Sequence, residues 1–175
     1  MRLNDLDAII PNKLYLGNLR AARSTRSLAE HRITHILSVC ADAIPAELPQ
    51  SGFHHMRISV EDVDFADLLI HFPSACRFIH QAVQSRGAIL VHDVEGQQGL
   101  SRSAAVVAAY LMWSQQINAA KALDTIRESR QHIWPNAGFQ EQLVLFELCQ
   151  YAPSPSNGIY QSWRYKIDRH LMGRR

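Results

Sequence analysis

The sequence has few cysteines, no strong charge bias and no long apolar run. Its three cysteines, Cys40, Cys76 and Cys149, are too far apart to form the close pairs of zinc and redox motifs. Their odd number also gives no sign of a disulfide framework. We therefore expect a reducing compartment, the cytoplasm or the nucleus, and neither a metal site nor a cofactor.

The net charge and the length of the apolar runs argue against a nucleic-acid-binding protein and against a membrane protein. Lysine and arginine total 18 against 16 acidic residues, and a net charge of +2 gives no reason to expect a nucleic-acid partner. No segment approaches the ~20 apolar residues needed to cross a bilayer. The opening MRLNDLDAII also lacks the basic and apolar regions of a signal peptide. We expect a protein that is not secreted and does not bind a membrane.

Length and patterning indicate one α/β domain followed by a tail. The 175 residues, 47% of them hydrophobic, are enough for a single core. Short apolar runs alternate with helical patterns, an order that favours a mostly parallel central sheet flanked by helices. We expect this domain over residues 1–150. The linker PSPSNG and a short helix packing on or near the domain should occupy residues 151–175.

Individual elements follow from the spacing of the apolar residues. Strands are predicted over residues 10–19, 33–40, 53–60 and 88–91. Helices are predicted over residues 24–31, 66–85, 103–114, 118–130 and 136–151. Pro73 should kink the second helix or start a new one, and Pro135 should be the first helical residue of the last.

The most informative stretch, residues 87–113, is typical of a buried strand, a polar glycine-rich loop and a helix. Unpaired N–H groups and the positive end of the helix dipole favour an anion at such a helix start. Glycines let the backbone close around a phosphate, and an arginine can bind two of its oxygens. The residues predicted to bind phosphate are Gly96, Gln97, Gln98, Gly99, Leu100, Ser101 and Arg102.

The same stretch carries a family resemblance. His92, the string GLSRS at 99–103 and the string AYLM at 109–112 resemble the signature of the dual-specificity protein phosphatases. The resemblance covers about residues 8–150, with LYLG near the start and PNAGFQEQLVLFE near the end. It implies a protein tyrosine phosphatase-like fold and, as partners, proteins phosphorylated on tyrosine, serine or threonine.

The chain departs from this family at the nucleophile. Active members carry His-Cys, five residues and then Arg, whereas here Asp93 follows His92 and eight residues separate it from Arg102. Counting back five residues from Arg102 leads to Gly96 instead. We prefer this second register, with residues 93–95 as a three-residue insertion, because glycine in the nucleophile's place resembles the Styx-type pseudophosphatases.

The resemblance also implies roles for single residues. Arg102 matches the arginine that holds the phosphoryl oxygens, and His92 matches the histidine that orients the loop. Ser103 matches the hydroxyl that assists the leaving thiolate; without a thiol, we expect it to cap the helix. Asp62 matches the general acid that protonates the leaving group, and Asp64 is its local competitor.

Asp93 also suggests a carboxylate nucleophile, because aspartyl-phosphate chemistry exists. Phosphatases of that kind generally use a divalent metal to offset the repulsion between carboxylate and phosphate, and the sequence has no visible metal cluster. At ~6 Å and an effective dielectric of ~20, this repulsion is on the order of 3 kcal/mol for each phosphate charge. Asp93 and Glu95 would weaken a phosphate site if they lie inside it.

Three hypotheses on function therefore stay open. The leading one is a catalytically impaired phosphatase fold, a pseudophosphatase, that recognises phosphorylated proteins. The second is an active phosphatase that uses Asp93 or another group. The third is an interaction domain that does not depend on phosphate. The sequence does not predict the oligomeric state.

Overall fold

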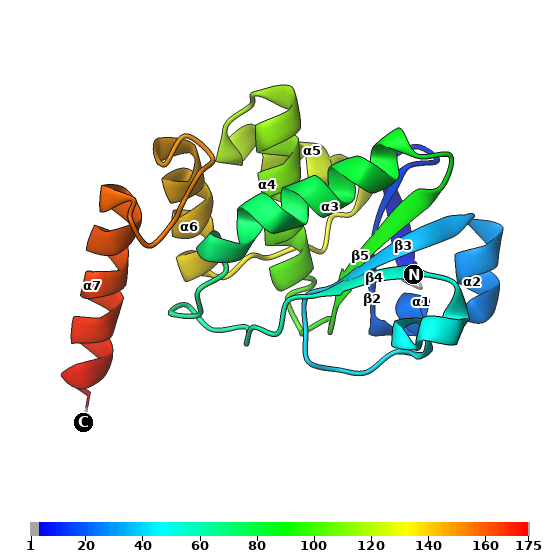
Figure 1. Cartoon of the computed structure of the whole chain (residues 1–175), viewed down its shortest axis with the longest axis horizontal. Coiled ribbons are helices and arrows are strands. Elements are labelled where there is room, and N and C mark those ends of the chain that lie inside the picture. The colour runs from blue at the N-terminus through cyan, green and yellow to red at the C-terminus, as the bar shows by residue number, and fades with distance from the viewer. Residues whose placement is uncertain (1–3, 175) are drawn as a thin grey trace.

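The computed structural model describes residues 4–174. A five-stranded sheet in the order β1-β2-β5-β3-β4 is the framework of the domain (Figure 1). The strands are β1 (Leu6–Ile10), β2 (Leu14–Asn18), β3 (Ile33–Ser38), β4 (His54–Arg57) and β5 (Ala88–Asp93). β1 is antiparallel to β2, whereas β5 is parallel to β2 and β3, and β3 is parallel to β4. The prediction of a mostly parallel sheet is confirmed.

The start of the chain differs from the prediction. In place of one strand over residues 10–19, the structure has the hairpin of β1 and β2. The turn between them contains Asn12 at φ 63°, a left-handed conformation that asparagine tolerates. β1 lies at the edge of the sheet, and only Leu6 of its residues is buried. Only three residues separate its apolar residues Ala8, Ile9 and Ile10 from those of β2, so the two short strands are not separated by apolar spacing alone.

Helices cover the sheet and extend beyond it. The α-helices are α1 (Leu19–Arg23), α2 (Thr25–Glu30), α3 (Phe72–Gln84), α4 (Arg102–Gln115), α5 (Ala119–Ser129), α6 (Ala137–Leu148) and α7 (Gly158–Met172). Short 3₁₀ helices are η1 (Pro45–Glu47), η2 (Pro49–Ser51) and η3 (Leu69–His71). Five of the α-helices begin after an Asn or Ser whose side chain accepts a hydrogen bond from the first turn. Among the described residues, no helix has the length and apolarity needed to cross a bilayer.

The two prolines near predicted helix starts behave differently. Pro73 lies in the first turn of α3, so it starts a new helix inside the pattern that begins at residue 66. Pro135 lies outside α6, because Asn136 after it caps that helix by accepting a hydrogen bond from Phe139 N at 2.9 Å. The predicted position of Pro135 as the first helical residue is wrong, since a side chain that satisfies a free N–H sets the boundary.

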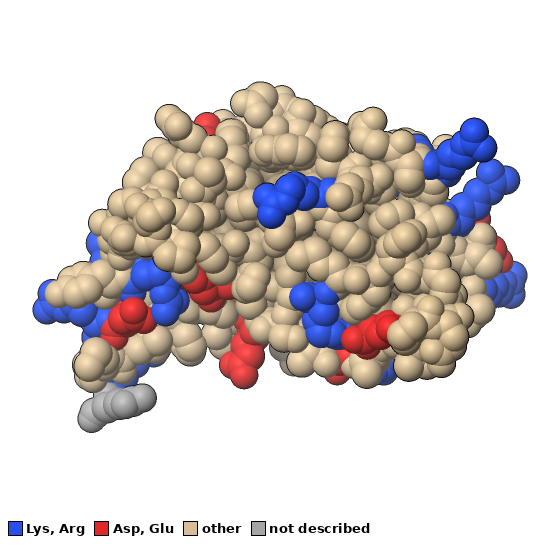
Figure 2. All heavy atoms as spheres, in the orientation of Figure 1, with Lys and Arg blue, Asp and Glu red and all other residues tan. Residues whose placement is uncertain are grey.

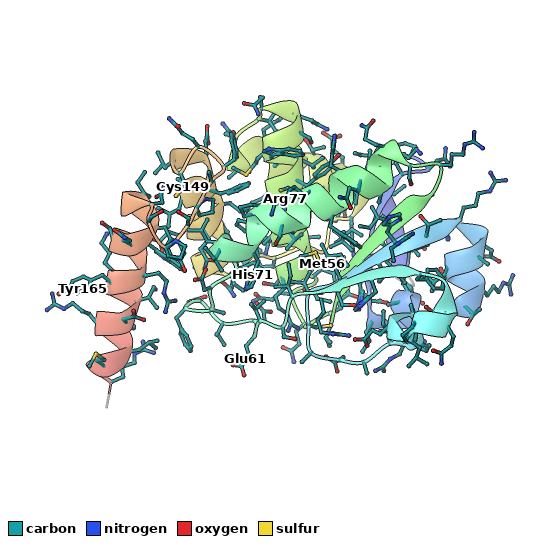
Figure 3. The ribbon with its side chains drawn as sticks, in the orientation of Figure 1. Met56, Glu61, His71, Arg77, Cys149 and Tyr165 are labelled. Carbon is teal, nitrogen blue, oxygen red and sulfur yellow. The ribbon has the colours of Figure 1, made fainter. Side chains whose placement is uncertain are left out.

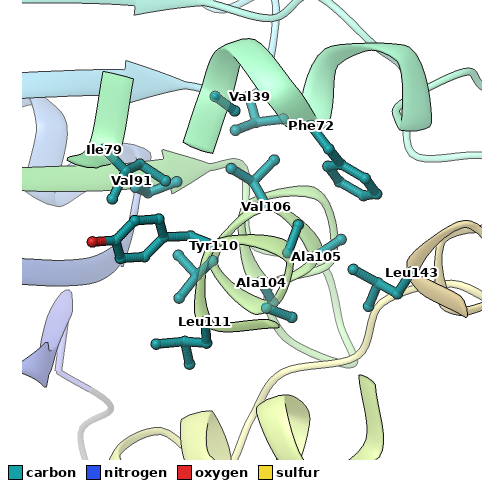
Figure 4. Close-up of a cluster of buried hydrophobic side chains, with 14 of the residues drawn as sticks. Val39, Phe72, Ile79, Val91, Ala104, Ala105, Val106, Tyr110, Leu111 and Leu143 are labelled. Carbon is teal, nitrogen blue, oxygen red and sulfur yellow. The ribbon is translucent and has the colours of Figure 1, made fainter. Parts of the chain in front are cut away.

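Alternate residues of β5 face two separate cores. Ile89 and Val91 face the larger core, formed with α3, α4, α5 and α6, whereas Ala88 and Leu90 face a smaller core beneath α1 and α2. Every residue of α4 from 103 to 112 is buried, as its largely apolar pattern predicts. Figure 4 shows Ala104, Val106 and Leu111 of this helix among the buried side chains. Packing on all sides fixes the N-terminus of α4 directly beyond the end of β5.

The chain ends in α7, which has 15 residues and is longer than the short helix predicted. It lies at the end of the molecule away from the sheet (Figure 1) and packs through Trp163, which is 4% exposed. The hydroxyl of Tyr160 donates a hydrogen bond to Asp67, and Arg164 lies 4.0 Å from the same carboxylate. These contacts tie the tail to the loop before η3.

Candidate active site at the end of the central strand

Asp93 is the last residue of β5, and its side chain is aimed at α4. The strand pairing continues to its end, with Asn18 opposite Asp93 on one side and Ser38 opposite His92 on the other. The Asp93 side chain is 1% exposed, and its Oδ2 accepts a hydrogen bond from Ser103 N at 2.9 Å. A carboxylate of the protein itself therefore occupies the anion-attracting end of α4.

This placement contradicts the register that we prefer from the sequence. Asp93 belongs to the paired strand and not to an insertion, because the pairing extends two residues beyond the apolar run that ends at Val91. Gly96, the expected occupant of the nucleophile's place, lies instead in an exposed turn closed by a hydrogen bond from Gly99 N to Gly96 O at 3.1 Å. The turn from Gly96 to Gly99 thus lies outside the strand pairing and away from the Ser103 amide that Asp93 contacts.

Burial changes the protonation of both residues at the end of β5. It raises the pKa of Asp93 from 3.8 to about 7, although the Ser103 amide and the Arg102 guanidinium oppose the rise. Burial also lowers the pKa of His92 to about 3, so this ring is neutral. His92 Nε2 lies 2.6 Å from Ser38 Oγ, a contact that holds the ring in place. Asp93 is therefore shared between its charged and neutral forms near pH 7.

Arg102 points inward beside Asp93. Its side chain is 13% exposed, Nη1 donates a hydrogen bond to the Val60 carbonyl at 3.1 Å, and Nε lies 3.8 Å from Asp93 Oδ2. Within residues 4–174, the buried atoms Arg102 Nε, Asp93 Oδ1 and Ser103 Oγ have no hydrogen-bond partner. Arg102 Nε and Ser103 Oγ are donors suited to a bound oxyanion, whereas Asp93 Oδ1 can donate to one only when the carboxyl is protonated.

Ser103 does not cap α4, contrary to our expectation. The helix begins at Arg102, so Ser103 lies inside its first turn, and its hydroxyl is unpaired. The first turn is capped instead by the Asp93 carboxylate, which accepts from the Ser103 amide. The cap is therefore a side chain of the preceding strand, in place of the Ser103 hydroxyl that we expect from the sequence.

Asp62 lies at the opposite wall of the site, held by two hydrogen bonds. Its Oδ1 accepts from Ser101 Oγ at 2.6 Å and from Asn136 Nδ2 at 2.9 Å. The structure therefore brings Asp62 to the loop, as the resemblance implies, whereas Asp64 lines the groove beside it. Figure 3 shows Glu61, from the same acidic segment, pointing away from the body of the molecule.

The segment that carries Asp62 is fixed from behind by α6. The buried Gln142 accepts hydrogen bonds from Leu68 N at 2.9 Å and Leu69 N at 2.8 Å, and donates one to Ala66 O at 2.9 Å. Gly138 lets the helix approach closely, because a Cβ there would lie 1.8 Å from a carbonyl oxygen of the segment. The sequence gives no sign of either contact.

The tip of the loop is joined to the chain that precedes α6. Leu100 N donates to His132 O at 3.3 Å, and Trp134 N donates to Leu100 O at 2.8 Å. Gly99 has φ 108°, and a Cβ on it would lie 2.1 Å from His132 O. The amides of Gly99 and Leu100 are therefore used within the protein, and in this part the loop differs from the open phosphate cup that we expect.

Glu95 is neutralised outside the site. It accepts hydrogen bonds from Arg130 Nη2 at 2.9 Å and from Asn18 Nδ2 at 3.2 Å. Arg130 is 3% exposed and also pairs with Asp7 at 2.9 Å. Of the two acidic residues that could weaken a phosphate site, only Asp93 is thus placed to do so.

An open groove of about 510 Å³ runs past the loop. Residues 96–99 and Ser101 form one side, and Asp62, Asp64 and Asn136 form the other. Trp134, which is 52% exposed, also lines the groove. Asp93 and Arg102 do not line this groove, although Ser101, which does, directly precedes Arg102.

A central strand that leads through an arginine-bearing loop into a buried helix, with an acidic loop alongside, defines a phosphatase-like α/β domain. A family model described as the dual specificity phosphatase catalytic domain matches residues 14–149. The chain belongs to this family.

Two curated relatives show the extent of the similarity. The chain is 36% identical to zebrafish dual specificity protein phosphatase 22-A over 160 residues, which cover 91% of this chain and 71% of the relative. It is 38% identical to mouse dual specificity protein phosphatase 19 over 140 residues, which cover 80% of this chain and 61% of the relative. The similarity therefore includes the loop and both of its walls.

Solved structures agree with this assignment. Human DUSP28 superposes with a TM-score of 0.76 at 34% identity, covering 86% of this chain and 98% of that structure. The human tyrosine phosphatase-like serine/threonine/tyrosine-interacting protein superposes with a TM-score of 0.75 at 32% identity, covering 84% of this chain and 98% of that structure. The protein tyrosine phosphatase-like fold is confirmed.

Proposed function

We propose that this protein is a catalytically impaired member of the family that recognises phosphotyrosine, phosphoserine or phosphothreonine on other proteins. The observation that carries the proposal is Asp93, a carboxylate at the helix terminus where the family chemistry uses a thiolate. A carboxylate at this point is a weaker nucleophile than a thiolate, and it repels the phosphate that it would attack.

None of the three cysteines supplies a substitute nucleophile. All are buried, and burial raises the pKa of Cys40, Cys149 and, to about 12, Cys76. The thiol form therefore predominates at neutral pH, and the thiol is a poor nucleophile.

Phosphate recognition is supported by the inward orientation of Arg102 and by two donors, Arg102 Nε and Ser103 Oγ, that have no hydrogen-bond partner within residues 4–174. Protonation of Asp93 below pH ~7 removes the charge that opposes a phosphate, because its pKa is raised to about 7. Binding of an anion whose own charge does not change in this range should therefore be stronger at pH 6 than at pH 8. Trp134 and the open groove provide surface for the peptide around the phosphorylated residue.

The proposal is tested by binding and turnover together. The protein should bind a phosphotyrosine peptide in calorimetry and hydrolyse no p-nitrophenyl phosphate above a buffer blank. Arg102→Ala should weaken binding at least tenfold, because it removes a charge-assisted contact. Arg77→Ala is the matched control: Arg77 is an exposed arginine on α3 (Figure 3). Peptide binding that Arg102→Ala leaves unchanged would contradict the proposal.

An active phosphatase is the second candidate, favoured by the position of Asp93 at the end of β5, facing Arg102. Turnover that is lost in Asp93→Asn would establish it. Asp93→Cys is the complementary test of register: hydrolysis restored by this variant, and not by Gly96→Cys, would place residue 93 in the nucleophile's position.

A phosphate-independent interaction domain is the third candidate. It is favoured by the internal hydrogen bonds of Gly99 and Leu100, which remove two amides from an anion cup. A protein that binds no phosphate and no phosphopeptide at either pH 6 or pH 8 would fit this candidate alone.

A further inference from the structure

A basic cavity lies at the opposite end of the sheet from the Arg102 loop. Its volume is about 590 Å³, and it is lined by Lys13 from the β1–β2 turn, His31 and Arg32 after α2, and Arg86 before β5. Lys13 and Arg86 precede the parallel strands β2 and β5, whereas Asp93 ends β5. A six-residue strand is ~20 Å long, so the cavity and the loop are separate sites.

The positive charges in this cavity are not neutralised by the protein. In residues 4–174, Arg32 and Arg86 form no ion pair. Glu30 is the acidic residue of the cavity lining, and its carboxylate is held by Arg26 at 2.7 Å. Figure 2 shows lysine and arginine side chains projecting at this end of the molecule, where Figure 1 has the β1–β2 and α3–β5 turns.

The floor of the cavity is ordered by internal contacts. Lys13 Nζ donates hydrogen bonds to the carbonyls of Ser85 and Gly87, so its charge is fixed at the base. His31 lies edge-on to the ring of Tyr15, with the ring centroids 5.0 Å apart. The buried Tyr15 thus gives the cavity a rigid wall that a flexible surface cluster of cations lacks.

Two residues of the lining have a left-handed backbone conformation, which asparagine tolerates and which is unfavourable for arginine. Asn12 has φ 63° and Arg32 has φ 54°. The left-handed region is costly for residues other than glycine, and residues held in it occur preferentially at binding sites. At Arg32 this conformation is combined with a guanidinium that has no ion-pair partner.

We propose that this cavity is a second anion site that accepts a phosphate monoester carried by a partner protein. Lys13, which is held by two carbonyls, and the exposed Arg32 and Arg86 together match one dianion, and they are too few for the many phosphates of a nucleic acid. The proposal does not depend on the function of the Arg102 loop, because the two sites share no residue.

A residue-resolved NMR titration of the full chain tests the proposal. Inorganic phosphate and a phosphoserine peptide should shift the amides of residues 12–15, 31–33 and 86–88, and the peptide should bind more tightly than free phosphate. Sodium chloride at matched ionic strength should leave these amides unshifted. These shifts should persist in Arg102→Ala, which separates this site from the loop.

Matched variants identify the groups that bind the anion. Arg86→Gln and Arg32→Asn should each lower roughly tenfold the affinity that the shifts of residues 12–15 and 86–88 report. Asparagine is chosen at position 32 because it tolerates positive φ. Arg77→Gln, which removes an exposed arginine of α3, should have no effect.

Several results would overturn the proposal. These are shifts confined to the Arg102 loop, equal shifts with chloride, and equal weakening by Arg77→Gln. Binding of inorganic phosphate without binding of the phosphopeptide would overturn the assignment to a partner protein.

Discussion

Replacing Asp93 with asparagine should stabilise the fold at pH 8 far more than at pH 5. Burial raises the pKa of this carboxyl from 3.8 to about 7, so the folded protein retains a proton that the unfolded chain releases. Stability therefore falls as pH rises from ~4 to ~7. At ~1.4 kcal/mol for each pKa unit, the loss by pH 8 is up to ~4 kcal/mol, of which ~3 kcal/mol arises above pH 5.

Asparagine is close in shape to aspartate and removes only the charge that burial opposes. Its side-chain oxygen can accept the hydrogen bond that Ser103 N donates to Asp93 at 2.9 Å. The variant should consequently lack the fall in stability between pH 5 and pH 7, while all other titrating groups stay the same. The difference between the two proteins isolates Asp93.

Urea unfolding of both proteins at pH 5, 6, 7 and 8 measures this difference. The advantage of Asp93→Asn should grow by ~3 kcal/mol from pH 5 to pH 8, with most of the change below pH 7. Asp64→Asn removes the same charge from an exposed side chain and controls for net charge. A difference between Asp93→Asn and the unaltered protein that is flat with pH would refute a buried carboxyl at the start of α4.

Three further predictions follow from the contacts around the loop. Sulfate, which stays a dianion from pH 6 to pH 8, should bind more tightly at pH 6, and calorimetry should find this pH dependence absent in Asp93→Asn. Arg130→Met should lower the free energy of unfolding by about 3 kcal/mol, because it leaves two carboxylates without their buried partner. Gly99→Ala should lower the free energy of unfolding, measured by chemical denaturation, by at least ~2 kcal/mol. Alanine would have to adopt a positive φ there, and its Cβ would lie 2.1 Å from a backbone oxygen. Gly96→Ala, whose Cβ would have no neighbour nearer than 3.9 Å, should cost little, and equal costs would contradict the close approach at Gly99.

The sheet and most helices could be predicted because apolar spacing is a local property of the chain. The buried helix α4, the capped helix α2 and the parallel strands β3 and β5 all carry such patterns. β1 was not separated from β2 in this way, because only three residues lie between the apolar residues of the two strands. The tail helix was predicted from its apolar spacing, but its length depends on the cap at Asn157 and on contacts with Asp67.

Some neighbours in the site could be predicted from the family resemblance, whereas the end of β5 could not. Asp62 lies at the loop and is bonded to Ser101, the residue before Arg102. The position of Asp93 depends on two polar residues continuing the pairing of β5, which an apolar run cannot indicate. The pairing of Arg130 with Glu95 joins residues 35 positions apart and leaves no periodic signal in the sequence.

The three hydrogen bonds of Gln142 have a consequence for the rate of association. They anchor the segment that follows Asp62 to α6, so this side of the groove is already ordered before a peptide binds. This segment of the protein then loses little conformational entropy when the proposed peptide docks, and association needs no closing step on this side of the groove.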